Sequence, residues 1–286
     1  MTDRPQQVRV GAALSDVLVT NTGAPQGCVL SPVLFTIYTA DCRANDPAVL
    51  QIKFADDTSL SGLVANSDES AYREAVGEMV DWCDEHFLEL NVTKTKEMIV
   101  DFRRKKEPVQ PLIIKGEEVR QVATYKYLGT TIDDQLSWTP NVDACLKKAN
   151  QRLFFLRKLR QFKVGSNILY LFYRSVIQSI LEYNMLCYYG ALKEDDAKRL
   201  NKVVEKAQNI VGKDIEQLGK AYENMSVKKA LSIFDDESHP LHQIIVEHKS
   251  KRVPGRFLSF KCHSNRFANT FLPSAIRSMN KTHERK

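Results

Sequence analysis

The period of the hydrophobic pattern changes once along the chain, near residue 138, and this change limits the folds that the chain can adopt. Before it, short apolar runs alternate with turn residues, as in strands joined by tight turns. After it, apolar residues recur at the spacing of long helices over residues 141–162 and 166–189. We predict an α/β (α+β) region with a small antiparallel sheet over residues 1–138 and an all-α region over residues 139–238. Residues 239–286 show no clear period, and we expect a basic, irregular tail.

Two adjacent carboxylates lie in the middle of a predicted hairpin. Residues 50–55 have the pattern of one strand and residues 58–63 that of the returning strand, so Asp56 and Asp57 occupy the tip. Two-metal phosphoryl transfer needs carboxylates that are rigid and close together, because Mg²⁺ takes oxygen ligands in near-octahedral geometry. Adjacent aspartates are also common in turns, since each can hydrogen-bond its own backbone there. The pair alone leaves both interpretations open.

A loop that leads into a helix precedes this hairpin. The segment GAPQGCVLSPVLF, residues 23–35, gathers Gly, Pro, Gln and Ser in front of an apolar helical stripe. A glycine in such a loop lets the backbone approach a ligand closely, and a glutamine side chain can both donate and accept hydrogen bonds. Taken alone, the segment fits a simple helix entry equally well, with Pro32 in the first turn.

With two further motifs, these segments resemble the polymerase signatures of LINE-type (non-LTR retrotransposon) reverse transcriptases. GAPQGCVLSPVLF resembles the family's PQG-x-x-LSP helix entry, and FADDT, residues 54–58, resembles its metal-binding hairpin. NVTKT, residues 91–95, resembles the N-x-x-K-T element, and residues 125–131 resemble the primer-grip turn. The four motifs stand in the family's order, and the resemblance covers most of residues 8–280.

This resemblance implies an RNA-directed DNA polymerase and gives the matched residues their roles. Asp56 and Asp57 would be catalytic and would bind Mg²⁺ as the cofactor, while Lys94 would lie near the leaving pyrophosphate. The residues expected to border the incoming dNTP and the template are Pro25, Gln26, Gly27 and Ser31. Residues 1–138 would then be a partial palm and residues 139–238 a thumb that grips the RNA template and DNA primer.

Positive charge is concentrated in two stretches that suit a polyanionic partner. Residues 147–163 hold seven Lys and Arg residues and no acid, and residues 247–286 hold ten against two acids. Phosphate contacts by such residues would make binding sensitive to salt. A solvated helix face and a flexible tail are the plainer interpretations of these runs. The residues that we expect to contact nucleic acid are Lys147, Lys148, Arg152, Arg157 and Lys158, together with Tyr127, Leu128 and Gly129 of the primer-grip turn.

One part of the family's two-metal site is missing from the sequence. The family takes a further aspartate from a strand well upstream of the PQG segment, and here only Asp3 and Asp16 precede that segment. Neither acid lies in the pattern of a buried strand. Without the third carboxylate, metal affinity and in-line geometry would fail, so we expect a truncated enzyme without autonomous polymerase activity. A palm without its first strands would also expose a sheet edge and an apolar face, which favours aggregation or a partner.

Two other functions are compatible with parts of the sequence. A thumb and tail could hold RNA without catalysis, and tail aromatics such as Phe257, Phe267 and Phe271 would then either stack on bases or anchor the tail. Residues 143–190 also resemble a segment assigned to the N-terminal part of AlkB-type dioxygenases and tRNA methyltransferases. A non-haem iron oxygenase needs two histidines and one carboxylate, and the sequence has neither an H-x-D motif nor a G-x-G loop. We therefore rank this alternative last.

Cysteines and histidines show no recognisable metal-binding spacing. The six cysteines include no C-x-x-C pair, and a set formed by His239, His242, His248, Cys262 and His263 lacks the fixed spacing of zinc ligands. The N-terminus has no apolar signal segment, and no apolar run approaches the length of a membrane span. We expect an intracellular chain, cytoplasmic or nuclear, that is not secreted and has no membrane partner.

Overall fold

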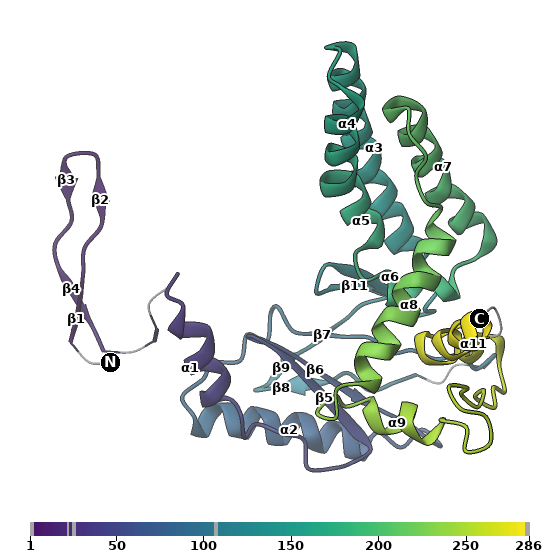
Figure 1. The fold of residues 1–286 in the computed structure, drawn as a ribbon. Coiled ribbons are helices and arrows are strands. Elements are labelled where there is room, and N and C mark those ends of the chain that lie inside the picture. The colour runs from purple at the N-terminus through teal and green to yellow at the C-terminus, as the bar shows by residue number, and fades with distance from the viewer. Residues whose placement is uncertain (1–2, 22, 25–26, 106–107, 284–286) are drawn as a thin grey trace. The chain divides into compact units, whose positions relative to one another are not determined.

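The computed structural model describes residues 3–21, 23–24, 27–105 and 108–283 and divides into two compact units. Unit 1 comprises Met1–Glu97 and Lys105–Arg120, and unit 2 comprises Met98–Arg104 and Gln121–Lys286 (Figure 1). The expected mixture of helices and small antiparallel sheets is present. The change of pattern near residue 138 lies inside unit 2, and the identity of the three segments as palm, thumb and tail stays a prediction.

Unit 1 is built from short antiparallel strand pairs, each of two strands. One hairpin contains β1 (Arg4–Gln6) paired with β4 (Leu18–Thr20), and β2 (Arg9–Val10) paired with β3 (Ala13–Leu14). The other pairs are β5 (Val49–Phe54) with β6 (Asp57–Gly62), and β8 (Ile113–Ile114) with β9 (Glu117–Glu118). The two-residue strands β7 (Lys96–Glu97) and β10 (Arg120–Gln121) lie next to the division between the units.

The core of unit 1 forms beneath its longer helix, α2 (Ser70–Glu85). Val76 on this helix is buried against Leu112, Ile114 and Val119, with Leu60 of β6 packed at the edge of the cluster. The shorter helix, α1 (Leu30–Tyr38), has no buried residue. Unit 1 therefore has a small core, and much of its apolar surface is exposed.

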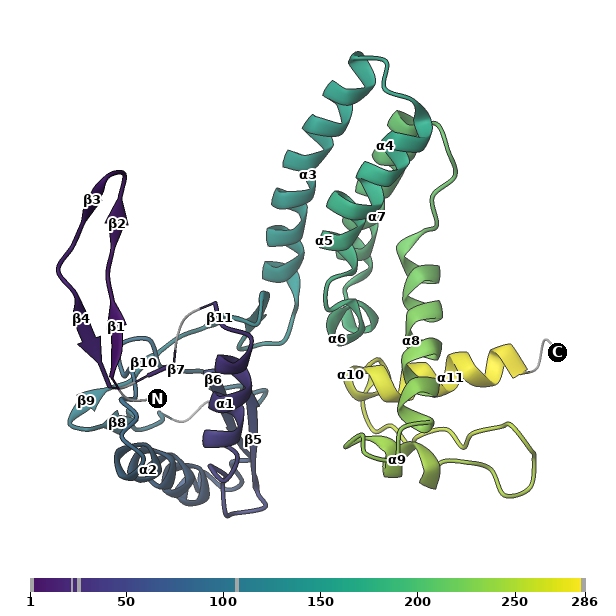
Figure 2. The ribbon, with the colours of Figure 1, turned by 60° about the vertical axis from the view of Figure 1, so that its left-hand side comes forward.

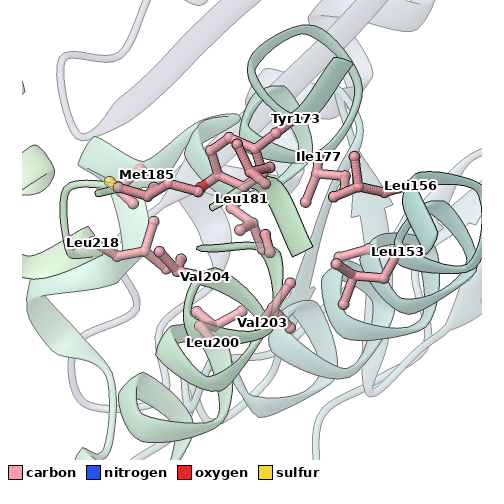
Figure 3. Packing of buried hydrophobic residues seen from close by; sticks show 14 of the residues in the cluster. Leu153, Leu156, Tyr173, Ile177, Leu181, Met185, Leu200, Val203, Val204 and Leu218 are labelled. Atoms are coloured by element: carbon pink, nitrogen blue, oxygen red, sulfur yellow. The ribbon is translucent and has the colours of Figure 1, made fainter. Parts of the chain in front are cut away.

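Unit 2 is mainly helical, and in both Figure 1 and Figure 2 the helices α3 (Thr139–Gln161), α4 (Ser166–Phe172) and α7 (Glu194–Val211) lie side by side. A further long helix, α8 (Leu218–Phe234), follows α7. Leu153 and Leu156 of α3 belong, with Leu200 and Val203 of α7, to one buried hydrophobic cluster, in which Leu153 lies near Val203 and Leu156 near Ile177 (Figure 3). Burying a leucine side chain stabilises a fold by about 1.5–3 kcal/mol, so this cluster is the main source of stability in unit 2.

The helix expected over residues 166–189 is interrupted twice. After α4 the chain forms a π-helical stretch, η1 (Tyr173–Gln178), and then α5 (Ser179–Glu182). The chain breaks at Tyr183 and Asn184, where Asn184 has a left-handed φ of 52°, before α6 (Met185–Tyr188) and the 3₁₀ turn η2 (Tyr189–Ala191). The break turns the chain back toward a hairpin formed by β11 (Thr124–Tyr127) and β12 (Thr130–Asp133).

The segment from residue 239 onward is more ordered than the sequence suggested. It contains α9 (His242–Glu247), α10 (Asn265–Ala268) and α11 (Phe271–His283). Phe257 and Ile276 are buried with Ile233 of α8 in a second hydrophobic cluster. The expectation of an irregular tail was therefore wrong for the described residues, because apolar residues far apart in sequence come together there.

Candidate functional site

The predicted hairpin is present, but its two-residue turn lies one residue earlier than the expected Asp56–Asp57 tip. Phe54 pairs with Asp57, so Ala55 and Asp56 form the turn and Asp57 begins β6. Ala55 has a φ of 52°, a left-handed conformation that costs a residue with a Cβ roughly 1–2 kcal/mol. Strain of this kind is concentrated at functional sites, where surrounding structure holds the backbone in place.

The side chains of Asp56 and Asp57 are exposed. Neither carboxylate has a hydrogen bond or an ion pair with another side chain in the part of the chain that the structure describes. No group of three His, Cys, Asp or Glu residues that could hold a metal ion occurs among the described residues. The pair thus offers two oxygen-donor side chains of the kind that Mg²⁺ prefers, but on its own it does not complete a two-metal site.

Lys53 attaches this hairpin to the end of α1. Its ammonium group donates a 2.9 Å hydrogen bond to the Cys42 carbonyl and another to the carbonyl of Thr39, the residue that ends α1. A cation at a helix C-terminus is favourable because the free carbonyl groups there carry partial negative charge. The helix that follows the PQG segment and the strand that leads to Asp56 are therefore held together by a side chain three residues before that aspartate.

The PQG segment is described only in part. Pro25 and Gln26 lie outside the described residues, whereas Gly27 has a φ of 75°. A Cβ at Gly27 would meet nothing within 4 Å, so the backbone conformation rather than space favours glycine there. Ser31 lies in the first turn of α1, and its backbone N–H donates to the Cys28 carbonyl at 3.3 Å. The backbone N–H of Leu30 at the same helix start lowers the pKa of the Cys28 thiol.

Lys94 lies in a turn that Asn91 organises. The Asn91 side-chain oxygen accepts hydrogen bonds from the Lys94 backbone N–H at 3.0 Å and from the Thr93 hydroxyl at 2.7 Å. The Asn91 carbonyl also accepts from the Thr95 hydroxyl at 2.9 Å. Lys94 itself is exposed. This arrangement fixes the backbone of the turn and leaves the lysine side chain in solvent.

Leu128 and Gly129 form the two-residue turn of the β11–β12 hairpin, within the segment that resembles the primer-grip turn. Tyr127 pairs with Thr130, and the turn residues have φ values of 43° and 83°. The Tyr183 hydroxyl donates to the Leu128 carbonyl at 2.7 Å, and the Asn184 amide donates to the Thr130 hydroxyl at 2.6 Å. The break between α5 and α6 thus holds this turn. Sequence analysis did not identify the role of Tyr183 and Asn184, which contact the turn across more than fifty residues of chain.

The expected nucleic-acid residues of α3 form a solvent-facing surface of unit 2. Lys147, Lys148, Arg152, Arg157 and Lys158 are all exposed, opposite the buried face of the helix. Two aromatic residues that sequence analysis did not single out lie among them. The Arg152 guanidinium is 6.0 Å from the ring centroid of Phe155, and the Lys158 ammonium is 5.7 Å from that of Phe154. Their signal in the sequence was the placement of two phenylalanines off the buried stripe of a basic helix.

The aromatic residues of the C-terminal segment mainly anchor it. Phe257 is buried, and Phe271 and Phe260 pack against the second cluster, whereas Phe267 remains 44% exposed. The nearby histidines contact backbone: the ring Nδ1 atoms of His242 and His248 lie 3.2 Å and 2.8 Å from the carbonyls of Ile233 and Ile244. Among the helices that the structure describes, none combines the length and apolar character needed to cross a bilayer.

Comparison with known proteins agrees with the two turn motifs. Residues 7–132 match the model of the reverse transcriptase (RNA-dependent DNA polymerase) family, and this stretch contains both the Asp56–Asp57 hairpin and the Leu128–Gly129 turn. The chain is also 30% identical over 166 residues to a probable RNA-directed DNA polymerase from transposon BS of Drosophila melanogaster. Residues 7–132 are a LINE-type reverse-transcriptase region. The transposon BS match covers 55% of the chain.

A second relative of the reverse-transcriptase region gives a longer match. It is the RNA-directed DNA polymerase from mobile element jockey of Drosophila melanogaster, 25% identical over 217 residues and 70% of the chain. The chain spans 18% of the transposon BS polymerase and 22% of the jockey polymerase. Residues 138–179 match a different family model, alkylated DNA repair protein alkB homolog 8, N-terminal. That match falls on α3, α4 and η1, which contain no histidine. No solved structure gives a significant match.

Proposed function

We propose that the chain supplies part of the palm and the thumb of a non-LTR RNA-directed DNA polymerase. Residues 1–138 would be the palm part, residues 139–238 the thumb and residues 239–286 an appendage to the thumb. The observation that carries the proposal is the Asp56–Asp57 hairpin, which Lys53 attaches to the helix that follows the PQG segment. Both elements lie inside the region that matches the family.

In the complete enzyme, Asp56 and Asp57 would be two of the carboxylates around Mg²⁺. The described residues bring no third ligand to them. In-line displacement requires the attacking and leaving oxygens to be held between fully ligated metals, so we assign no metal-dependent step to this chain alone. We expect it to have no autonomous polymerase activity.

The other predicted residues have supporting roles in this proposal. Lys94 would reach the pyrophosphate from the turn that Asn91 fixes. The segment with Pro25, Gln26, Gly27 and Ser31 would border the nucleotide, and the positive φ of Gly27 supports a close backbone approach there. These roles come from the family resemblance, and the exposure of Lys94 is compatible with its role.

Unit 2 would hold the template–primer duplex. Six cations of α3, the five named above and Arg160, face solvent, and no acid occurs between residues 144 and 181 of the sequence. Contacts to phosphates and to the shape of the duplex suit a protein that must accept any sequence. The Tyr127–Leu128–Gly129 turn, held by Tyr183, would contact the primer.

Primer extension on an RNA template with Mg²⁺ tests the catalytic part of the proposal. We compare the full chain with Asp56→Ala and, as a control, with Asp16→Ala, which removes another exposed acid. The expected result is no extension by any of the three proteins. Extension that disappears only in Asp56→Ala would show that a third carboxylate comes from elsewhere and would overturn the expected inactivity.

Duplex binding tests the thumb part. The chain should bind an RNA–DNA duplex, and its association constant K should decrease as the salt concentration rises. In the variant Lys147→Gln/Lys148→Gln the slope of log K against log salt should become less negative by about 2, since each lost phosphate contact removes about 0.9 from its magnitude. The control, Lys202→Gln/Lys206→Gln, removes two exposed lysines from α7 and should leave the slope unchanged. An unchanged slope in the α3 variant would contradict the thumb assignment.

A second candidate is an RNA-binding protein without polymerase chemistry. The incomplete carboxylate set and the exposed cations of α3 favour it. It has the same fold and differs from the first candidate only in turnover. Duplex binding without extension supports it, and extension that depends on Asp56 excludes it.

A further inference from the structure

An open apolar groove of about 420 Å³ lies in unit 2 beside the cations of α3. Its lining residues are Arg152, Phe155, Lys158, Leu159, Phe162, Phe172 and Val176, from α3, the residue after it, α4 and η1. Its size falls in the range of roughly 300–1,000 Å³ that is usual for small-ligand sites. The two charged residues among its lining are both cations.

The aromatic side chains at this groove are unusually exposed for their type. Phe155 on α3 is 48% exposed and Phe162, the residue directly after α3, is 80% exposed, whereas Leu153 and Leu156 on the other face of the helix are buried. Large apolar side chains are normally buried, so an exposed cluster indicates a surface that binds something. Phe154, the residue before Phe155 in α3, is 52% exposed as well and lies edge-on to Phe155, with ring centroids 5.6 Å apart.

The charge around the groove selects the kind of ligand. Arg152 lies over the ring of Phe155, and Lys158 lies over the ring of Phe154. No acid occurs in the sequence between Asp143 and Glu182, and the charged residues that line the groove, Arg152 and Lys158, are both positive. A flat, apolar ligand attached to negative charges fits this surface. An unpaired nucleobase with its flanking phosphates has these properties, because stacking needs only an exposed π-face and the phosphates pair with the cations.

We propose that the groove between Phe155, Phe162 and Phe172 binds unpaired bases of single-stranded RNA. In a duplex the bases are stacked on one another, so a duplex would meet the cations at the rim and leave the groove empty. A single strand can turn its bases into the groove. This inference rests on the proposed nucleic-acid function of unit 2 and adds the class of ligand that the aromatic groove takes.

Fluorescence from 2-aminopurine in a single-stranded RNA reports base stacking directly. The proteins compared are the full chain, Phe155→Leu and Phe162→Leu, with Phe87→Leu as the matched control, since Phe87 is 95% exposed and lies in unit 1. Leucine keeps an apolar side chain but has no π-face. We expect each groove variant to bind the single strand about tenfold more weakly, which corresponds to the loss of one stacked base. The change in 2-aminopurine fluorescence on binding should disappear in both groove variants, whereas Phe87→Leu should behave as the unsubstituted chain.

The RNA–DNA duplex serves as the second ligand for the same proteins. We expect its affinity to stay within about twofold in both groove variants, while Lys147→Gln/Lys148→Gln weakens binding of both ligands. Equal losses for duplex and single strand, or no loss for either, would overturn the groove assignment and leave the thumb proposal standing. An absence of all nucleic-acid binding by the unsubstituted chain would overturn both. Groove variants that change only the self-association of the chain in sedimentation would show that the groove is a protein contact.

Discussion

The hydroxyl of Tyr183 donates a 2.7 Å hydrogen bond to the backbone carbonyl of Leu128, at the turn of the β11–β12 hairpin. Leu128 has a φ of 43°, which is costly for a residue with a branched side chain. A turn in this conformation needs contacts from other parts of the chain, and the Tyr183 hydroxyl supplies one by binding the Leu128 carbonyl. The primer-grip-like turn of unit 2 is therefore held by the break between α5 and α6 as well as by its own strands.

Replacing Tyr183 with phenylalanine should weaken this support. We expect Tyr183→Phe to lower the free energy of unfolding of unit 2 by about 1 kcal/mol, the usual net value of one hydrogen bond. Trp138 reports unit 2 alone in a Trp82→Phe background, because the chain has two tryptophans and Trp82 lies in unit 1. Tyr125→Phe is the control, since no described residue hydrogen-bonds the Tyr125 hydroxyl. Equal effects of the two substitutions would contradict the assigned role of Tyr183.

Replacing the neighbouring Gly129 with any other residue should lower the stability of unit 2. Its φ is 83°, and an added Cβ would lie 3.0 Å from the ring of Tyr183. We expect Gly129→Ala to destabilise unit 2 by about 1–2 kcal/mol or more. Gly129→Asn separates the backbone strain at positive φ from the contact of the added Cβ with Tyr183. Asparagine adopts positive φ more readily than alanine but carries the same Cβ. Gly165→Ser, at the open N-cap of α4, should cost nothing.

The chemistry of the cysteines should differ along the chain. The start of α1 lowers the pKa of the Cys28 thiol, whereas burial raises that of Cys145. Because the thiolate is the reactive form, Cys28 should be alkylated faster than Cys145, and the difference should grow as the pH falls toward neutrality. Peptide mass spectrometry after timed iodoacetamide labelling measures both rates. Faster labelling of Cys145 in the folded chain would show that the helix start does not act on Cys28.

Turn chemistry made the existence of both hairpins predictable from sequence. Asp56 and Gly129 both lie in two-residue turns between alternating runs, although the turn at Asp56 begins one residue earlier than predicted, at Ala55. The basic face of α3 was predictable too, because its buried and exposed residues follow one helical period. These features depend on residues that are close together in sequence.

Features that depend on distant contacts were not predictable. Asn280 of α11 accepts the Phe257 backbone N–H at 3.0 Å and donates to the Phe257 carbonyl at 2.8 Å, which orders a segment that has no period of its own. The break at Asn184 likewise contains no Gly or Pro, and its left-handed backbone accompanies a hydrogen bond to Thr130. Local propensity cannot report such contacts, since their partners lie many residues away.

Tyr72 gives unit 1 a dependence on alkaline pH. Burial, together with the nearby Glu97 carboxylate, raises the pKa of Tyr72 from its ordinary value near 10 to about 12. The unfolded chain therefore loses this proton first, and the stability contributed by the neutral hydroxyl is present below pH 10 and is lost as the pH rises toward 12. The loss should reach about 2–3 kcal/mol. Denaturant unfolding followed by Trp82 fluorescence should show it, and Tyr72→Phe should remove that pH dependence while leaving the contributions of other tyrosines.

The outer face of β5 should make the chain self-associate. Leu50, Ile52 and Phe54 alternate along one side of the strand and are 60%, 46% and 62% exposed, while Lys53 on the other side holds α1. Side chains two residues apart share a face, so the three form one apolar stripe. Exposed apolar stripes on short sheets favour association.

Threonine substitutions on this stripe test the association. The double variant Ile52→Thr/Phe54→Thr places β-branched threonines, which suit a strand, at both positions. It should shift the chain toward monomer in sedimentation velocity at micromolar concentration. Its thermal stability should change little, because the replaced side chains are already largely in solvent. Leu60→Thr is the contrasting variant: Leu60 packs at the core beneath α2, so the substitution should lower stability without reducing association. If the double variant associates as strongly as the unsubstituted chain, some other surface mediates the contact.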